Sequence, residues 1–357
     1  MYKHFPLFLV DKVVIMGGYN GENVNNVSSE VIDFGDFTNE KQQCQDWSPY
    51  PHQTSGSTGS FIPSQEYALI CGGNWAPDEC YKIDDTSTTF IAKMSIGRSY
   101  AASIYISETM LWVTGGSPNM EKNTGLSSTE IIDNEHALGR PGPEMPIALA
   151  SHEIVAFNES VFMIIGGVRF GSKDSLNSAL TFYYFEESKA WAEGPTLIEA
   201  RSGHVAGFVT DTDTNERILI VAGGYSGDYL DSVELFFEQD SNEWIPGNTD
   251  FFKNTLRIVC VIFLHLILFD PIGPKLPKPL GSHTKTELDN NLLVIGGISI
   301  LEPQSAIYSF GCSQGNCIWT TLSQKLSAPR YSAIAMVIPS SLTNCASKNI
   351  SGCKEID

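Results

Sequence analysis

Three histidines recur at matching places in the sequence, and imidazole is the commonest protein ligand for transition metals. His152, His204 and His283 each stand at the start of an expected strand, after a small residue. A ring of such side chains could hold a metal ion. A repeated chain, however, also repeats residues that have a structural purpose, so repetition alone explains the spacing. We therefore expect these histidines to be structural, and we expect no metal and no cofactor.

Two pairs of cysteines lie close together in the sequence. Cys312 and Cys317, in GCSQGNC, flank a Gly-containing turn and could face each other across a hairpin. Cys345 and Cys353, in CASKNISGC, could close a small loop in a C-terminal tail over residues 339–357. Neither pair has the spacing of a zinc site. Both are therefore candidate disulfides.

The remaining cysteines give weaker signals. Cys71 lies in an expected buried strand, where a free thiol behaves as a small inert hydrophobe, while Cys44 and Cys80 occur in loop-like sequence. Two local pairs favour an oxidising compartment, and hence an extracellular location. A cytoplasmic location is the alternative, because the apolar run over residues 5–10 is too short for a signal-peptide core.

Charge and motifs exclude several classes of function. The net charge of −19 repels phosphate backbones, so we expect no nucleic-acid partner. The sequence contains no Gly-rich phosphate loop, nucleophile elbow or zinc-protease helix motif. We therefore expect that the protein is not an enzyme.

The elements that must position these residues are set by a repeat. An apolar strand ending in Gly-Gly occurs six times, with first-glycine spacings of 55, 43, 51, 57 and 73 residues. A polar loop and a second strand follow each pair, often with a Trp beyond it. The six pairs are Gly17-Gly18, Gly72-Gly73, Gly115-Gly116, Gly166-Gly167, Gly223-Gly224 and Gly296-Gly297.

Four short strands per unit, at a period near fifty residues, are typical of a β-propeller blade. One such sheet cannot bury both of its faces, whereas radial stacking covers each face with the next blade. The glycines allow a sharp turn where the blades converge.

The double glycine after an apolar strand, the later strand with Glu-Val or Glu-Leu, and the Trp near the fourth strand resemble the kelch repeat. The resemblance covers residues 4–338 and implies an all-β, six-bladed kelch-type β-propeller of four-stranded antiparallel blades over residues 1–338. Two units depart from the pattern: Phe90 replaces the Trp of the second, and the third has only HALGRPGPEMP (136–146) there. We expect these two blades to pack less tightly on the Trp side.

Two segments could supply the strand that closes the first blade. SAPRYSAIAMVIP (327–339) looks like the first strand of a unit that lacks its Gly-Gly, and KHFPLFLV (3–10) is the other candidate. In kelch-like propellers the last stretch of chain commonly completes the first blade, so we favour residues 327–339.

An apolar block interrupts the fifth unit. Trp191 stands three residues before Gly194, and Trp244 stands three residues before Gly247 rather than before Gly273. Deleting residues 248–273 restores EWIPGPKLPKPLGSH and shortens the spacing of 73 residues to 47. The apolar run over residues 256–269 has fourteen residues, too few to span a membrane. We therefore expect no membrane span and hypothesise a retained intron.

The function that the resemblance implies is non-catalytic binding of a protein partner by a monomeric propeller. Kelch resemblance implies that the loops after each Gly-Gly form one binding face together with the segments leading into the next first strand. Aromatic and Arg side chains are common anchors at interfaces. The candidate contacts, some of which could instead pack onto neighbouring loops, are Tyr19, Asn20, Asn74, Trp75, Arg169, Phe170, Tyr225 and Tyr229.

Two other functions stay open. One is an intracellular adaptor or cytoskeletal module, and in that case this chain could be a fragment of a larger adaptor protein. The other is a carbohydrate-active enzyme, because some kelch-like propellers are copper radical oxidases or sugar epimerases. Oxidase chemistry needs a Tyr–Cys crosslink beside further Tyr and His ligands, and no local motif here brings those residue types together.

Overall fold

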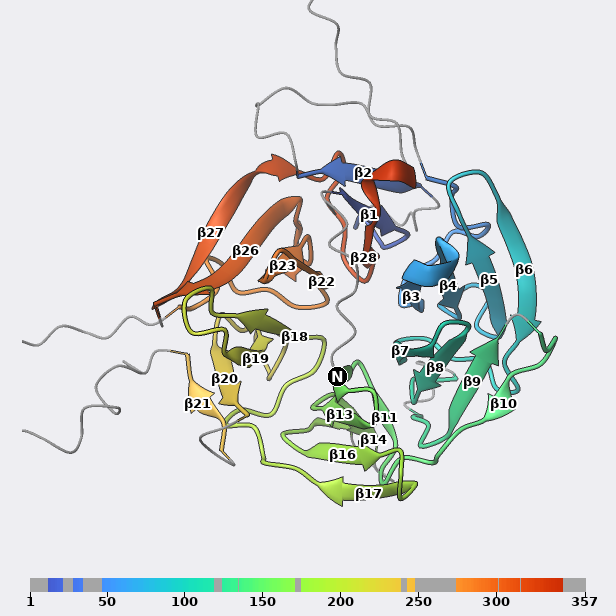
Figure 1. Ribbon diagram of the computed structural model, residues 1–357, viewed down its shortest axis with the longest axis horizontal. Coiled ribbons are helices and arrows are strands. Elements are labelled where there is room, and N and C mark those ends of the chain that lie inside the picture. The colour runs from blue at the N-terminus through green and yellow to red at the C-terminus, as the bar shows by residue number, and fades with distance from the viewer. Residues whose placement is uncertain are drawn as a thin grey trace, which may run out of the picture.

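Six β-sheets surround a central axis in the computed structural model (Figure 1). The structure describes residues 12–21, 28–34, 47–118, 124–133, 135–170, 175–238, 243–247, 274–300, 302–314 and 316–342. Within these ranges the chain forms strands and two 3-10 turns, and no α-helix. The predicted all-β, six-bladed propeller is confirmed.

The first three blades are built as follows. Blade 1 contains β1 (Lys12–Met16), β2 (Ser29–Asp33) and β28 (Ile334–Ile338), and the 3-10 turn η3 (Ser340–Leu342) follows β28. Blade 2 contains β3 (Thr58–Ile62), the 3-10 turn η1 (Pro63–Gln65), β4 (Tyr67–Cys71), β5 (Glu79–Ile83) and β6 (Thr88–Lys93). Blade 3 contains β7 (Ala102–Ser107), β8 (Met110–Thr114), β9 (Thr129–Asp133) and β10 (Arg140–Pro141).

The other three blades, like blades 2 and 3, are four-stranded sheets. Blade 4 contains β12 (Glu153–Asn158), β13 (Val161–Ile165), β16 (Thr181–Phe185) and β17 (Ala190–Glu193). Blade 5 contains β18 (Val205–Thr210), β19 (Arg217–Ala222), β20 (Val233–Phe237) and β21 (Ile245–Pro246). Blade 6 contains β22 (Thr284–Leu288), β23 (Asn291–Ile295), β26 (Ala306–Ser313) and β27 (Asn316–Lys325).

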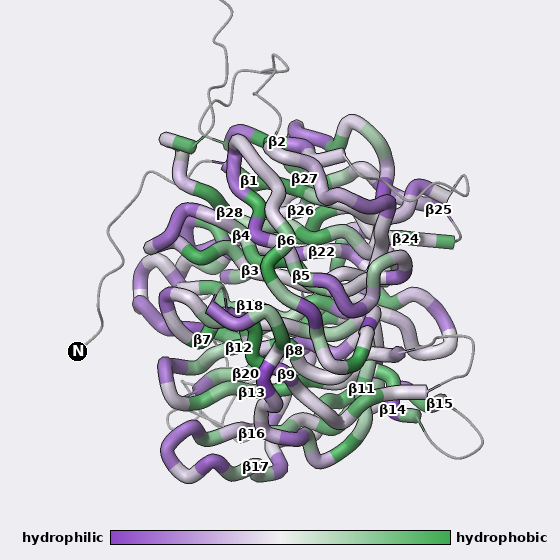
Figure 2. The backbone as a smooth tube through the Cα atoms, turned by 90° about the vertical axis from the view of Figure 1, so that its right-hand side faces the viewer, coloured by the Kyte–Doolittle hydropathy of each residue, from purple (hydrophilic) through white to green (hydrophobic). Residues whose placement is uncertain are grey.

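Two small sheets are built from loops that follow Gly-Gly pairs, together with β11 from the segment that leads into β12. One contains β11 (Leu149–Ala150), β14 (Val168–Phe170) and β15 (Ser175–Asn177), and the other contains β24 (Ile298–Ser299) and β25 (Glu302–Pro303). Seen edge-on, β14, β15, β24 and β25 lie on the same side of the disc (Figure 2).

The C-terminal strand closes the propeller, as favoured from the sequence. β28 pairs antiparallel with β1, with Met16 opposite Ile334 and Lys12 opposite Ile338. Of the other sequence predictions, residues 3–10, the apolar block 248–273 and residues 343–357 lie outside the described residues.

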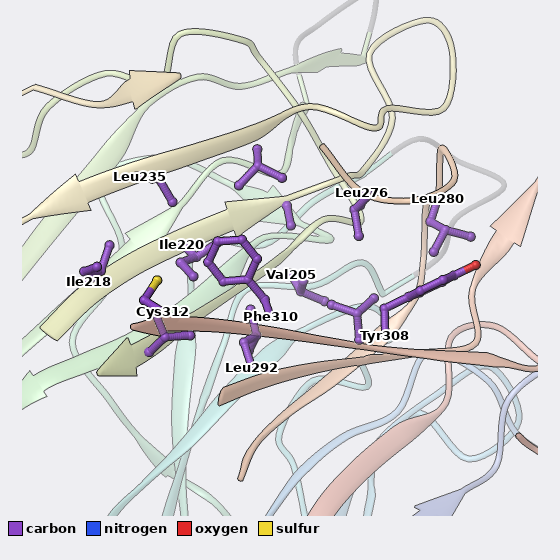
Figure 3. Close-up of a cluster of buried hydrophobic side chains, with 14 of the residues drawn as sticks. Val205, Ile218, Ile220, Leu235, Leu276, Leu280, Leu292, Tyr308, Phe310 and Cys312 are labelled. Carbon is purple, nitrogen blue, oxygen red and sulfur yellow. The ribbon is translucent and has the colours of Figure 1, made fainter. Parts of the chain in front are cut away.

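The core consists of six clusters, each between two neighbouring blades. Between blades 5 and 6, side chains such as Ile220 and Leu235 pack against Leu292 and Phe310 (Figure 3). Such burial of apolar area contributes about 25 cal/mol per Å². The first Gly of each pair permits this close approach: a Cβ on Gly223, whose φ is +64°, would lie 2.7 Å from the carbonyl oxygen of Leu280.

A closed ring of six backbone hydrogen bonds links all the blades around the axis. In each blade, the residue two positions before the first strand donates its N–H to the carbonyl of its counterpart in the preceding blade, with N···O distances of 2.7–3.1 Å. All six residues have φ between +49° and +69°. The ring residues are Gly56, Tyr100, Ser151, Gly203, Ser282 and Ser332.

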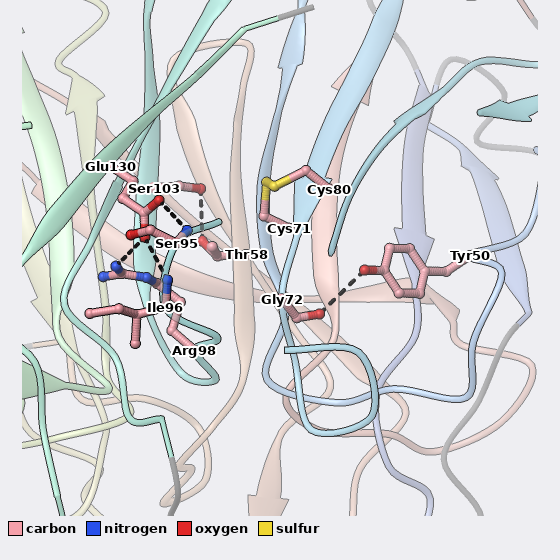
Figure 4. The surroundings of a disulfide bond; sticks show 10 residues. All are labelled: Tyr50, Thr58, Cys71, Gly72, Cys80, Ser95, Ile96, Arg98, Ser103 and Glu130. Atoms are coloured by element: carbon pink, nitrogen blue, oxygen red, sulfur yellow. Dashed lines mark hydrogen bonds and ion pairs between the residues drawn. A yellow bond between two sulfur atoms is a disulfide. The ribbon is translucent and has the colours of Figure 1, made fainter. Parts of the chain in front are cut away.

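A buried Arg–Glu pair recurs in every second blade. In blade 3, Arg98 donates to Gly115 O at 2.8 Å and to Glu130 Oε1 at 2.7 Å, and Glu130 also accepts the Ser95 N–H (Figure 4). Arg201 with Glu234 repeats this arrangement in blade 5, and Arg330 with Glu30 repeats it in blade 1. Such charge-assisted bonds fix the loop that joins one blade to the next.

Two disulfides each join directly opposite residues of neighbouring strands. Cys312 is bonded to Cys317 across β26 and β27, and Cys71 is bonded to Cys80 across β4 and β5 (Figure 4). The interpretation of Cys71 as a free thiol, with Cys80 in a loop, is wrong. The segment between β4 and β5 is short enough that Cys80 lies on β5, opposite Cys71. Cys44, Cys345 and Cys353 lie outside the described residues.

Candidate partner-binding face

One end of the disc gathers the loops after each Gly-Gly and the segments leading into each first strand, because these strands are antiparallel neighbours. We call this end the Gly-Gly face. The ring of backbone bonds lies on the same side, since its residues directly precede the first strands.

Tyrosines from different blades cluster on the Gly-Gly face. The rings of Tyr19 and Tyr331 lie 5.4 Å apart, and their backbones exchange two hydrogen bonds of 2.9 and 3.1 Å. The rings of Tyr225 and Tyr229 lie 5.7 Å apart. Burial raises the pKa of Tyr331, with smaller contributions from Tyr19, Tyr100 and Tyr229. The Tyr331 phenol therefore stays neutral and can donate a hydrogen bond at physiological pH.

The predicted contact residues divide into two groups. Four are exposed, namely Asn74, Trp75, Arg169 and Tyr225, and four are half-buried, namely Tyr19, Asn20, Phe170 and Tyr229. The half-buried ones include residues that pack onto neighbouring loops: the Phe170 ring covers Gly125, and the Tyr229 ring lies against Gly281. The structure brings all eight to the Gly-Gly face, on four loops that each carry two of them.

Trp75 is the most exposed aromatic side chain described, at 71%. Its neighbour Asn74 fixes the loop, because Asn74 Nδ2 donates to Ser55 Oγ at 2.9 Å and to the Tyr100 hydroxyl at 3.4 Å. The Asn74 N–H also donates to the Ser55 carbonyl at 3.0 Å. The hydrogen bonds of Asn74 therefore fix the backbone of this loop while the Trp75 side chain stays exposed to solvent.

Sequence reasoning missed several residues of this face. Tyr100 and Tyr331 lie in the segments leading into first strands, beside the recurring arginines, and that recurrence was the available signal. Leu176 on β15 is 57% exposed, and Ile300, between β24 and β25, is 79% exposed. Both follow a Gly-Gly pair, but short apolar residues in loops are not distinctive in a sequence.

The three recurring histidines line a small axial cavity of about 120 Å³ beside the ring of backbone bonds. His152 Nε2 lies 2.9 Å from Thr114 Oγ1, and His283 Nε2 donates to the Ala222 carbonyl at 3.2 Å. Neither nitrogen of His204 has a hydrogen-bond partner among the described residues.

Burial keeps these imidazoles neutral. It lowers the pKa of His152 to about 3 and that of His283 to about 4, and it lowers the pKa of His204 well below its usual value, with help from Arg201. Within the described ranges, no three His, Cys, Asp or Glu side chains are grouped as metal ligands.

Known proteins resemble this chain in repeat and fold. No protein-family model matches it. Kelch-like protein 41b of Danio rerio is 26% identical over 140 residues, which is 39% of this chain and 21% of that protein's length. The solved structure of YjhT superposes with a TM-score of 0.58 at 16% identity, over 80% of this chain and 88% of that chain. At that identity the likeness shows the fold alone.

The six Gly-Gly units, the six stacked sheets and these two likenesses identify the chain as a kelch-type β-propeller. The match spans about a fifth of the Danio rerio protein. In the part of the chain that the structure describes, no helix is both long and apolar enough to cross a membrane.

Proposed function

We propose that this propeller binds a protein partner through its Gly-Gly face, without catalysing a reaction. The observation that carries the proposal is Trp75, which is 71% exposed on a loop held by Asn74. Exposed large apolar side chains on a soluble protein mark interaction sites when they gather on one surface. Tyr225 and Ile300 add such side chains to the same face.

Rigid presentation supports the proposal. Asn177 Nδ2 donates to the Tyr225 carbonyl at 2.8 Å and so joins the loops of blades 4 and 5. The bonds between Tyr19 and Tyr331 and those of Asn74 hold other loops in the same way. Loops that are already ordered lose little entropy on association, which favours affinity.

Nothing in the described residues favours oxidase chemistry. A Tyr–Cys crosslink requires a free thiol beside a Tyr ring. The four described cysteines are all in disulfides, namely Cys71, Cys80, Cys312 and Cys317. The disulfides also favour an extracellular location over an intracellular adaptor, because cross-strand disulfides persist in oxidising compartments.

The test compares two single substitutions of equally exposed side chains. Trp75→Ala removes the candidate anchor, and Ile318→Ala removes a 63% exposed side chain on the outer strand β27. Proteins retained on the immobilised wild-type chain are quantified by mass spectrometry, and the strongest candidate is purified for titration. We expect Trp75→Ala to raise its Kd at least tenfold, as for an interface hot spot, and Ile318→Ala to leave it within twofold.

Unchanged unfolding midpoints would show that both variants fold. The proposal fails if no retained protein depends on Trp75, or if both substitutions weaken binding equally.

A further inference from the structure

The boundary between blades 3 and 4 contains a cleft of about 470 Å³. Aromatic side chains form its floor: Trp112 on β8, Phe162 on β13 and Tyr184 on β16, each less than 5% exposed. Ile106 and Ile131 of blade 3 form the facing wall. The lining is therefore mainly apolar and aromatic.

The cleft arises from one departure from the repeat. Trp112 is the third residue before its Gly-Gly, and the other five blades have an aliphatic residue there: Val14, Leu69, Met163, Ile220 and Leu293. Its indole lies 5.1 Å from the Tyr184 ring and 6.0 Å from the Trp191 ring. A large ring therefore occupies space that a small side chain fills in the other blades.

Trp191 lacks the bond that two of its counterparts make, and Trp47 Nε1 likewise has no acceptor among the described residues. Trp244 Nε1 donates to Pro195 O at 3.0 Å, and Trp319 Nε1 donates to Pro274 O at 2.9 Å, each across to the preceding blade. Trp191 Nε1 is buried without an acceptor among the described residues, and so is Trp112 Nε1. Both indole nitrogens are buried, so neither N–H is open to a partner in the cleft.

The mouth of the cleft is acidic. Glu159, in the turn between β12 and β13, is exposed and makes no hydrogen bond or ion pair within the described ranges. Glu186 and Lys189, in the turn between β16 and β17, are paired with each other. The rim therefore carries one unbalanced negative charge, on a chain whose net charge is −19.

We propose that this cleft is a second docking site, for a partner segment with an aromatic side chain next to Lys or Arg. The ring enters between the blades against the aromatic floor, and the cation meets Glu159. A cleft of this volume falls within the usual range for ligand sites, and an aromatic anchor beside a charge is a common hot spot. The site lies in the side of the propeller and is distinct from the Gly-Gly face.

The test uses three blocked dipeptides with the full chain: N-acetyl-Trp-Arg-amide, N-acetyl-Trp-Glu-amide and N-acetyl-Gly-Arg-amide. Binding is followed by saturation-transfer NMR and calorimetric titration. We expect saturable binding of the first, at least fivefold weaker binding of the second, and none of the third up to several millimolar. No binding of the first, or equal binding of the first two, overturns the proposal.

Substitutions locate the site. Glu159→Lys should raise the Kd of N-acetyl-Trp-Arg-amide at least fivefold, whereas Glu66→Lys, in the hairpin between β3 and β4 of blade 2, should leave it within twofold. Trp112→Leu, which restores the residue type of the other blades, should abolish binding. Binding that survives Glu159→Lys and Trp112→Leu overturns the assignment. A homodimer that depends on Glu159 would identify a second copy as the occupant and overturn it as well.

Trp75→Ala separates this proposal from the function of the Gly-Gly face. It should leave dipeptide binding unchanged, so failure of either proposal can be recognised without the other.

Discussion

At the scale of single residues, the Arg–Glu pairs show where the repeat is not uniform. Arg98, Arg201 and Arg330 occupy a place that Thr54, Leu149 and Leu280 occupy in the three intervening blades. A search for one-blade periodicity does not find a residue that recurs every second blade. The pairing could not be read from the sequence, because each Arg lies about thirty residues or more from its Glu.

Breaking one pair should be costly. Glu130→Ala leaves Arg98, whose side chain is fully buried, without the carboxylate 2.7 Å away. We expect the free energy of unfolding to fall by about 3–5 kcal/mol, the usual cost of an uncompensated buried charge. Chemical denaturation measures it, with the exposed Glu193→Ala on β17 as the control, expected within about 0.5 kcal/mol. A loss below about 1 kcal/mol would contradict the assigned role.

The axial histidines should make the fold sensitive to acid. Their folded-state pKa values lie below the value of about 6.5 expected when unfolded, so the unfolded chain binds protons first as pH falls. Each histidine then removes about 1.4 kcal/mol of stability per pH unit below 6.5, while stability above pH 7 is unaffected.

Urea denaturation at pH 7.5 and 5.5 measures this effect. Three neutral histidines should lower the unfolding free energy by about 4 kcal/mol between those pH values. Glu153 forms an ion pair with Lys285 and lines the same axial cavity, and burial raises the pKa of its carboxyl. Glu153 therefore adds stability as the pH falls, which is opposite to the effect of the histidines. The comparison is therefore made with His204→Gln, which should remove about a third of the loss. Equal pH dependence of the two proteins would contradict the prediction.

At the scale of strands, the sequence predicted the six strands that end in Gly-Gly, because each of these strands is a continuous apolar run. The strands that lack such a pattern were harder to place. ECYKI (79–83) has charged residues at both faces, so β5 and its Cys80 were assigned to a loop. Polar strands are placed by their hydrogen-bonded neighbours, which a sequence does not reveal.

Disulfide mapping tests these strand registers directly. Cys71 and Cys80 face each other in β4 and β5, and so do Cys312 and Cys317 in β26 and β27. Alkylation without reductant, followed by digestion and mass spectrometry, should find both linkages in protein from its natural source. Recovery of alkylated Cys80 or Cys317 would contradict the disulfides and the extracellular location together.

At the scale of the whole molecule, the repeat predicted the number of blades and the closing strand, but not the cleft. Trp112 fits the apolar pattern of its strand, and only contacts with Tyr184 and Trp191 from the next blade show that it is too large. The absence of a Trp from the third unit does not explain the cleft between blades 3 and 4, because the recurring Trp side chains, such as Trp244 and Trp319, contact the preceding blade. The third unit's Trp would accordingly face blade 2.

The interruption of blade 5 leads to a prediction about the complete chain. Gly194 and Leu197 donate their N–H groups to the carbonyls of Thr181 and Ala179. Gly247 and Leu276 do the same toward Val233 and Asp231, so the two units match if Gly247 is joined to Pro274.

A chain without residues 248–273 should therefore fold with a thermal midpoint equal to or above that of the full chain. Thermal unfolding measures this, and sequencing of mature transcripts tests the retained-intron hypothesis. A deletion variant that fails to fold would contradict the expected stability of the shortened chain. Transcripts that all encode residues 248–273 would contradict the retained-intron hypothesis.

The register of the closing strand pair determines how the molecule responds to pulling. Lys12 begins β1 and Ile338 ends β28, and these two residues face each other. A force applied through the two flanking segments therefore acts at one end of the ladder and across its hydrogen bonds, which lie perpendicular to the strands. The bonds then break one after another rather than all together, so the seam unzips at low tension before any other blade bears a load.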